Sequence, residues 1–516
     1  MVWLLALLLS QADDPTTVAA KLDAAIGGIP GIAGKPEPKP VGDDAFIRRL
    51  YKDLVEVAPT AAEAQAFAAD PNPNKRAALI DQLLADDRFG GYWARRFTST
   101  WFGDPSKLRF VDLQGLPEGF EQKVLKNFEG WLAGRLRKDV PWNQVVYDIL
   151  DSRGTTEGDP AMAYKLSFYR GKEMPLDFAQ GMARDFLGIR LYCTRCHDHP
   201  YDRWTIDDLY GMAAFIARQR VRIVDGTMVE LKHSDSGELI LPGARALVIE
   251  PKFLFGGKPG QFDDRMKLLG FYLSQRSTIQ VPRVLVNRAW AWLFGAGIHH
   301  PLDDFGLMYK PISPALLDIL TRDVADHQIS LRRLVQVICL TKAYQMPTPE
   351  EMPEVATFRH LARARASTLG YSPLGDSPPV IPLAFDAPAA WERVRDRQGS
   401  KALFIVRGKQ DASQRAEFAL LQGNMSRWTV NSNLKQFVNP KVTKDLLEGK
   451  LKATWKEVAG PNTCIRGQDG PTEFVAIAVV VEAPAGPFTF RFEGPASVVE
   501  EWRAEVVALV KSAVPR

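Results

Sequence analysis

The side chains that could do chemistry are concentrated in one stretch, "LYCTRCHDHPYDRW", which runs from Leu191 to Trp204. It holds two of the chain's four cysteines and two of its seven histidines. In the pattern C-x-x-C-H, two thiols one helical turn apart can form thioether bonds to a porphyrin, and the histidine that follows can ligate the iron. Cys193, Cys196 and His197 stand in that order. The pattern predicts haem c bound through both cysteines, with His197 as the proximal ligand.

Two other interpretations of this segment remain open. Cys193 and Cys196 could form a disulfide turn, or Asp198, His199 and Asp202 could join the cysteines around zinc or another divalent metal. A closed zinc site usually has a second ligand pair at a distance, and the chain has no second CxxC and no HxxxH. His199, directly before Pro200, is also typical of a turn residue that orients a neighbour.

A c-type haem has either an open sixth position or a distal histidine or methionine. The stretch "GIHHPLDDFGLMYKP" offers His299, His300 and Met308 just after a predicted helix, so His300 and Met308 are the candidate distal ligands. Surface histidines and a core methionine are the ordinary alternative. The sequence presents no catalytic set that spacing alone can support, and it leaves open whether the protein is an enzyme.

The first residues, "MVWLLALLLSQA", favour export. An apolar run from Val2 to Leu9 is followed by Ser10, Gln11 and Ala12, with small residues where a signal peptidase reads them. A buried N-terminal helix is the alternative, because the run is short and lacks a preceding Lys or Arg. We expect residues 1–12 to be a signal peptide and the protein to be periplasmic or extracellular. No later stretch is apolar enough for a membrane span.

Periodicity predicts a mainly α body over residues 44–365 and an α+β domain after it. Residues 13–43 contain a short helix over about 13–28 and the Pro-rich spacer "GKPEPKPVGDD". Capping boxes at Thr60 and Thr205, and N-caps at Ser313 and Ser330, mark helix starts. Residues 220–260 look irregular, with short strand-like pieces. We divide the body into a CxxCH domain over 44–220 and a second helical domain over 221–365.

A Pro- and Gly-rich linker is predicted over residues 366–382. Beyond it the hydrophobic period changes to that of strands in "ALFIVRG", "AEFALLQG", "EFVAIAVVVE" and "PFTFRFEG". The amphipathic stretch "SVVEEWRAEVVALVKSAV" then predicts a closing helix. Residues 383–516 therefore form an α+β domain.

The composition indicates a globular protein and gives no sign of nucleic-acid binding. The chain of 516 residues is 46% hydrophobic and has a formal net charge of +4, without a basic block that alternates with aromatics. Such a chain is globular, and nucleic acid is not an implied partner. A protein that holds haem outside the cytoplasm would have a redox or electron-transfer role with a redox partner that the sequence does not identify.

Three blocks carry a family resemblance: "FIRRLYKDLVEVAPTAAEAQAF…", "FLGIRLYCTRCHDHPYDRWTIDDLYGMAAFIA" and "RVLVNRAWAWLFGAGIHHPLDDFG…LTKAYQ". Together they resemble the planctomycete secreted cytochrome-like family, whose cytochrome-like domain of unknown function is followed by a planctomycete-specific companion domain. The resemblance covers roughly residues 44–346. It implies secretion and a c-type haem at Cys193, Cys196 and His197, and it implies no particular reaction. Longer members have an additional N-terminal domain with its own CxxCH, which this chain lacks, and residues 367–516 lie outside the core pattern.

Overall fold

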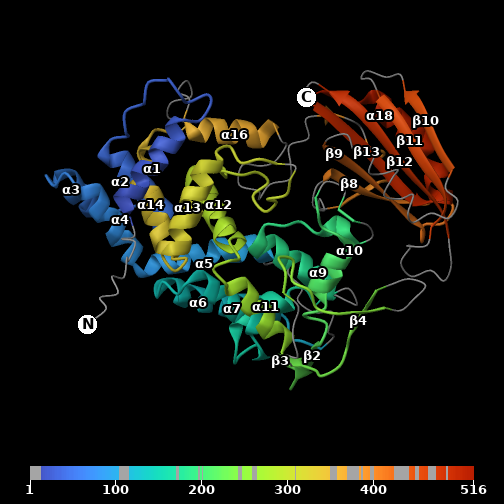
Figure 1. Ribbon diagram of the computed structural model, residues 1–516, viewed down its shortest axis with the longest axis horizontal. Coiled ribbons are helices and arrows are strands. Elements are labelled where there is room, and N and C mark those ends of the chain that lie inside the picture. The colour runs from blue at the N-terminus through green and yellow to red at the C-terminus, as the bar shows by residue number, and fades with distance from the viewer. Residues whose placement is uncertain are drawn as a thin grey trace, which may run out of the picture.

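The chain folds into a helical body followed by a sheet domain, as a computed structural model shows (Figure 1). The structure describes residues 13–103, 115–169, 174–195, 198–199, 202–241, 247–257, 264–307, 309–348, 357–368, 383–384, 387–394, 400–422, 441–447, 453–462, 472–483 and 486–515. The predicted signal peptide, Cys196, His197, Met308 and Cys464 lie outside these residues. Within them, no helix is both long and apolar enough to cross a membrane.

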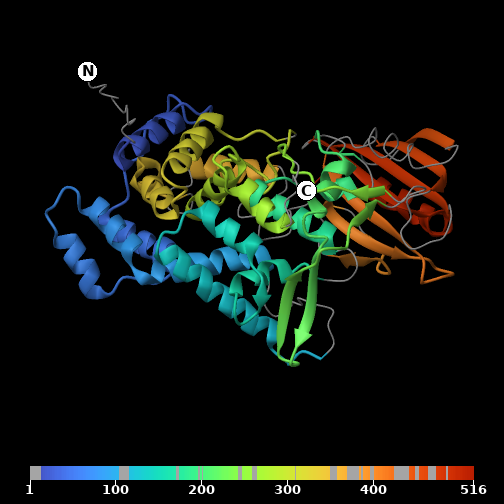
Figure 2. The ribbon, with the colours of Figure 1, turned by 60° about the horizontal axis from the view of Figure 1, so that its bottom comes forward.

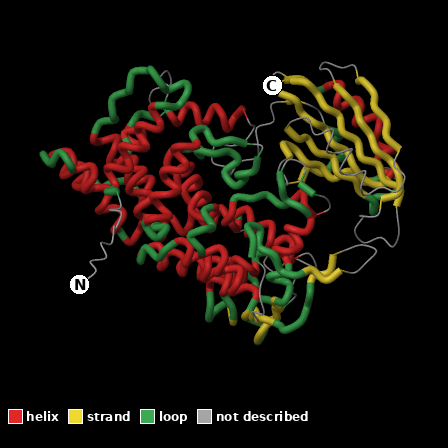
Figure 3. Tube along the Cα trace, viewed as in Figure 1, coloured by secondary structure: helices red, strands yellow, loops and turns green. Residues whose placement is uncertain are grey.

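The body is built from helices that bury one shared apolar core (Figures 1 and 3). Its α-helices are α1 Pro15–Gly27, α2 Asp43–Val55, α3 Ala61–Ala69, α4 Lys75–Ala85, α5 Asp87–Phe102, α6 Phe120–Arg137, α7 Trp142–Asp151, α8 Ala163–Leu166, α9 Met174–Met182, α10 Ile206–Ala213, α11 Arg265–Ser274, α12 Gln280–Phe294, α13 Pro314–Asp326, α14 Leu331–Leu340, α15 Lys342–Gln345 and α16 Phe358–Thr368. The predicted fold class, mainly α with a C-terminal α+β domain, is confirmed.

The predicted helix starts are confirmed by their hydrogen bonds. The N–H of Glu63 donates to Thr60 Oγ1 over 3.2 Å, and the N–H of Thr60 donates back to the Glu63 carboxylate over 2.7 Å. Thr205 and Asp208 repeat this reciprocal cap at the start of α10. Each cap satisfies amide groups that the first turn of a helix leaves without partners.

The segment before the spacer also belongs to the body. The predicted short helix exists as α1, and it packs against α13 and α14 with Val18, Leu22 and Ile26 buried. The Pro-rich spacer is tied back to the body, since the Val41 N–H donates to the Gln345 carbonyl over 2.9 Å. Residues 13–43 therefore contribute to the core of the second helical domain.

The short strands predicted after residue 220 are confirmed, but the first of them are more regular than expected, and the predicted start of the linker lies inside a helix. The residues expected to be irregular after 220 form a regular hairpin of β2 (Gln219–Val224) and β3 (Met228–His233), joined by β1 (Gly154–Thr155) in one antiparallel sheet. Asp225 and Gly226 take the positive φ values, 51° and 67°, that tight hairpin turns require. The helix α16 continues to Thr368, beyond the predicted linker start at residue 366, because alanine and arginine favour helix. Residues 369–382 of that linker lie outside the described residues.

The remaining strands are short or belong to the C-terminal domain. Its antiparallel sheet has the order β10-β11-β12-β13-β9-β8-β7. The strands are β4 Leu239–Leu241, β5 Leu247–Ile249, β6 Leu383–Ala384, β7 Glu392–Val394, β8 Ser400–Arg407, β9 Arg415–Gln422, β10 Lys441–Leu447, β11 Ala453–Asn462, β12 Thr472–Ala483, β13 Gly486–Pro495 and β14 Val514–Pro515. Helix α18 (Ala496–Ser512) covers one face of this sheet with Val499, Trp502 and Val506 (Figure 3).

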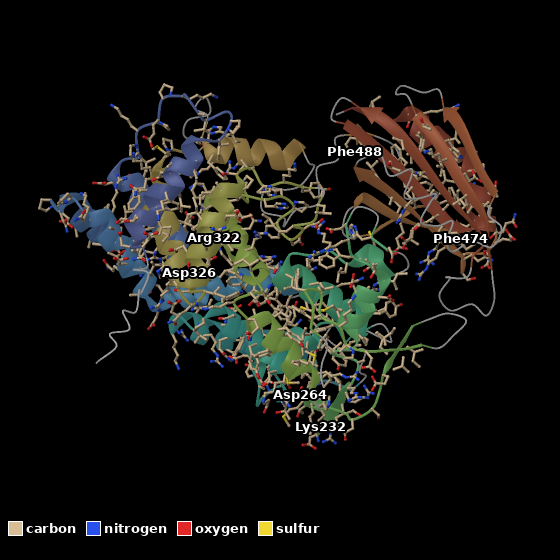
Figure 4. All side chains as sticks on the ribbon, in the orientation of Figure 1. Lys232, Asp264, Arg322, Asp326, Phe474 and Phe488 are labelled. Carbon is tan, nitrogen blue, oxygen red and sulfur yellow. The ribbon has the colours of Figure 1, made fainter. Side chains whose placement is uncertain are left out.

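The strands of the C-terminal sheet run from one end of the domain to the other, and the domain lies at one side of the helical body. Phe474 and Phe488, near the starts of neighbouring antiparallel strands, lie near opposite ends in Figure 4. Figures 1 and 2 both place the sheet domain beside the α9–α10 part of the body and away from α3 and α4. The C-terminal domain therefore stands beside α9 and α10, the helices on either side of the Tyr192–Arg195 turn.

One charged side chain is fully enclosed in the body. Lys165 is 1% exposed, and its ammonium group donates to the carbonyl oxygens of Leu150, over 3.1 Å, and Ser152. Burial lowers the pKa of Lys165 to about 7, because a charge is poorly solvated there, and nearby Arg153 acts in the same direction.

This lysine should give the protein a pH-dependent stability. The unfolded chain keeps its proton up to the ordinary lysine pKa, whereas the folded chain releases it from about pH 7. Stability should therefore rise with pH between about 7 and 10, by roughly 1.4 kcal/mol for each unit of pKa shift. We expect Lys165→Met to flatten this rise in urea unfolding measured from pH 6 to 10.

The exposed Lys123, which pairs with Glu157 over 2.8 Å, provides the matched control. Lys123→Met should keep the wild-type slope. An unchanged slope in Lys165→Met would show that this lysine titrates normally in the folded protein.

Candidate functional site

The CxxCH segment is reached through an unusual change of backbone conformation. A π-helical turn over Ala183–Leu187 follows α9 and ends at Gly188, whose φ is 64°. A Cβ at this position would lie 2.3 Å from the ring of Phe305. Only glycine allows this conformation and this approach together. The chain then enters a single 3-10 turn, Tyr192–Arg195, which contains Cys193.

This turn is held by contacts on both sides. Inside it, Thr194 donates to the Leu191 carbonyl through both its amide, over 3.1 Å, and its hydroxyl, over 2.7 Å. Arg195 forms an ion pair with Asp177 of α9. The thiol-bearing Cys193 is half-buried.

The residues after the cysteines fix the loop backbone. The Ile206 N–H donates to the Asp198 carboxylate over 3.1 Å, and the His199 N–H donates to the Trp204 carbonyl over 2.7 Å. The Leu307 N–H donates to the Asp202 carboxylate over 3.2 Å. The two carboxylates of the alternative metal site thus already accept backbone amides. Among the described residues, no three His, Cys, Asp or Glu side chains gather in a way that could hold a metal ion.

The second candidate segment lies directly against the first. Asn287 of α12 shapes it, because its side chain donates to the His299 carbonyl over 3.0 Å and accepts the His299 N–H over 2.8 Å. The Phe305 N–H donates to the Gly188 carbonyl over 2.8 Å. The fold therefore brings together the two segments that sequence analysis singled out.

The two histidines of this segment are used within their own loop. His299 and His300 are each 2% exposed. Nδ1 and Nε2 of His299 lie 3.1 and 3.0 Å from the carbonyl oxygens of Pro301 and Tyr309, so only a doubly protonated ring donates to both. Nε2 of His300 accepts the Gly297 N–H over 3.0 Å. His300 could ligate iron through that nitrogen only by giving up this bond.

An ion pair joins the two segments. Nε of Arg190, three residues before Cys193, donates to the Asp303 carboxylate over 3.2 Å. Burial disfavours the charged form of Asp303, but the positive charges of Arg190, Arg184 and Arg288 outweigh it and lower the pKa of this carboxyl. Sequence analysis missed Arg190, which lacks a local signal.

Asp304, the next residue, has the opposite electrostatic environment. Burial raises the pKa of Asp304 to about 6, with Asp303 and Asp202 acting in the same direction and Arg190 opposing them. The carboxylates of Asp202 and Asp304 converge on Gly306, where a Cβ would lie 2.7 and 3.0 Å from them. The site thus holds two neighbouring carboxyl groups with different pKa values: that of Asp303 is lowered, and that of Asp304 is raised to about 6.

A residue of the C-terminal domain also interacts electrostatically with the site. Arg491 of β13 lies 3.4 Å from the carboxylate of Glu493 and 3.9 Å from that of Glu417. Burial works against its charge, but these glutamates, followed by Cys193 and Tyr192, raise the pKa of Arg491. The guanidinium is therefore an electrostatic neighbour of the CxxC turn. Sequence analysis missed it, because nothing near residue 491 indicates an electrostatic interaction with a segment so far away in the chain.

These features define a protein with two helical domains, in which the loop after α12 of the second domain is bonded to the residues around the CxxCH motif of the first. Residues 33–221 match the family model PSCyt2, described as a protein of unknown function (DUF1549), and residues 264–377 match PSD1, a protein of unknown function (DUF1553). A comparison with curated proteins gives no match. The name PSCyt2 suggests a cytochrome-like domain and assigns no reaction. The resemblance to a two-domain family of unknown function is thus confirmed, and planctomycete origin remains a prediction.

The unusual carboxyl of Asp304 can be tested by thermodynamics. Its pKa near 6 in the folded state exceeds the ordinary value, 3.8, so the folded state binds the proton more tightly. Stability should fall as pH rises from about 4 to 6 and then stay lower, by up to roughly 3 kcal/mol at 1.36 kcal/mol per unit. Asn keeps an oxygen for the Gly306 N–H and cannot ionise, so Asp304→Asn should be more stable than wild type at pH 7.5.

Urea unfolding at pH 4 and pH 7.5 measures this difference. Asp326→Asn, at an exposed position of α13, is the matched control and should leave the pH dependence unchanged. A stability loss in Asp304→Asn at pH 7.5 would mean that the ionised carboxylate stabilises the loop.

Proposed function

We propose that the protein carries one c-type haem, attached through Cys193 and Cys196 with His197 as its proximal ligand, and that it has a redox or electron-transfer role. The observation that carries this proposal is that the side chains of the CxxCHDH segment have different environments. Asp198 and Asp202 accept backbone amides, whereas Cys193 is half-buried on a short turn. Sulfur and imidazole nitrogen are the donor types that haem c uses, whereas a hard divalent cation prefers oxygen ligands such as carboxylates.

The chain's own residues would make the haem site rigid. The ion pairs Arg195–Asp177 and Arg190–Asp303 hold the turn from two directions, so the thiols would meet a porphyrin without a large loss of conformational freedom. A bound haem supplies reversible one-electron chemistry at its iron. The protein's part is to set the ligands, the burial and the charges around it.

Export is part of the same proposal. Haem c is attached outside the cytoplasm, and the apolar run from Val2 to Leu9 followed by Ala12 is typical of a secretory signal. The match to a family model with a cytochrome-like name supports the proposal without adding a reaction. We therefore propose a periplasmic or extracellular location for the mature chain.

Covalent attachment gives the decisive test. Chain expressed with haem-maturation machinery should show a Soret band and a mass increase of one haem. Cys193→Ala or Cys196→Ala should weaken covalent attachment, and the double variant should leave any haem extractable by acidic organic solvent. His197→Ala should change the spectrum far more than the matched variant His199→Ala, because only His197 directly follows the second cysteine.

A wild-type chain with neither Soret absorption nor added mass would contradict the haem proposal. Metal analysis and thiol titration would then separate the alternatives. Bound divalent metal with reduced cysteines would indicate a non-haem metal site, and two unreactive thiols without metal would indicate a disulfide in a secreted binding or structural protein.

The distal ligand is a separate question. We propose His300 or Met308 for this position, and the bond from Gly297 to Nε2 of His300 makes methionine the easier choice. Met308→Ala should therefore shift the ligand-sensitive visible bands more than His300→Ala. Leu307→Ala, at a neighbouring side chain that is 75% exposed, should leave them unchanged. If none of the three variants shifts these bands, the sixth position is open or holds water, which would favour small-molecule chemistry over simple electron transfer.

A further inference from the structure

Strand β13 has two faces, and both are withdrawn from water. Phe488, Phe490 and Phe492 point to the face that α18 covers. Thr489 and Arg491 alternate with them and lie on the opposite face. In a domain with one sheet and one helix, that opposite face would ordinarily be solvated.

The opposite face is instead buried. Thr489 is 0% exposed, and the side chain of Arg491 is 14% exposed. Ala476 and Ala478 of the adjacent strand β12 are each 0% exposed. This face of the sheet is therefore covered by another part of the protein.

The part of the body that stands beside the sheet domain is the candidate for this covering part. Cys193 and Tyr192 are among the groups whose charges act on Arg491. Figures 1 and 2 agree that the sheet stands beside the part of the body that contains α9 and α10, the helices on either side of this turn.

The charges on the sheet fit such a contact. Arg491 sits between Glu493 and Glu417, two carboxylates of its own domain, so its charge is balanced before it meets the body. A buried arginine without such partners would be strongly destabilising. The flat, weakly hydrated guanidinium is also suited to pack near a phenol ring and a thiol.

We propose that the C-terminal sheet domain is a cover for the CxxC turn of the helical body, held in place by Arg491. The inference concerns the apoprotein as well and does not depend on haem. It gives a role to residues that neither family model matches, since the second match ends at residue 377. Any group that is attached to Cys193 would have to reach it before this cover closes.

Cross-linking in the full chain tests the contact. In a Cys196→Ser, Cys464→Ser background, the remaining native cysteines are Cys193 and the fully buried Cys339. Adding Arg491→Cys should allow a short bis-maleimide to join position 491 to Cys193 within one chain, identified by peptide mass. Lys511→Cys, exposed near the end of α18 on the other face of the sheet, is the matched control and should give no such cross-link.

A second measurement does not require a new cysteine. In the same background, Arg491→Glu adds a third acidic group beside Glu417 and Glu493, so the cover should open more often. Labelling of Cys193 by a maleimide on a polyethylene glycol chain should then speed up about tenfold, equivalent to about 1.4 kcal/mol of lost docking free energy, while labelling by iodoacetamide changes less. Lys511→Glu should behave like the parent.

The two measurements together decide the proposal. The cross-link to position 491, together with selective acceleration by Arg491→Glu and an unchanged circular dichroism spectrum, supports the cover. Equal cross-linking from positions 491 and 511, or equal polymer-labelling rates in the parent and both glutamate variants, would overturn it.

Discussion

The geometry of the site depends on the ion pair between Arg190 and Asp303, two residues 113 positions apart in the chain. The carboxylate of Asp303 is partly buried and stays charged because three arginines, Arg190, Arg184 and Arg288, surround it. Removing Arg190 would weaken this compensation, because only Arg184 and Arg288 would then offset the partly buried carboxylate. The pair therefore ties the CxxCH segment to the loop after α12. These two parts match different family models, so the contact also joins two domains.

A backbone constraint acts beside this ion pair. The π-helical turn ends at Gly188, whose carbonyl accepts the Phe305 N–H and whose missing side chain leaves room for the Phe305 ring. The Asp202 carboxylate adds a third connection through the Leu307 amide. Three independent connections between the same two segments make the CxxC turn a rigid support, which suits the covalent binding of a planar group.

The sequence predicted much of this fold because many signals act over a few residues. The helix starts at Thr60, Thr205, Ser313 and Ser330 follow from side chains that cap amides within three residues. The strands and final helix of the C-terminal domain follow from their hydrophobic period. The hairpin at Asp225 and Gly226 was missed because its strands carry many charged residues, which weakened the alternation, although the turn pair itself was a usable signal.

In the candidate site, the residue types could be predicted from the sequence, but their partners could not. By itself the sequence determined the order of Cys193, Cys196 and His197, and therefore the kinds of group that this segment could bind. Only the tertiary structure decided that Asp198 and Asp202 accept backbone amides and that His299 and His300 make hydrogen bonds within their own loop. It also decided that Arg190 pairs with Asp303 and that Arg491 interacts electrostatically with the CxxC turn. Ligand order is a property of a few consecutive residues. Partners such as Asp303 for Arg190 are chosen by how whole helices and strands pack, and that packing is set by apolar contacts between residues far apart in the chain.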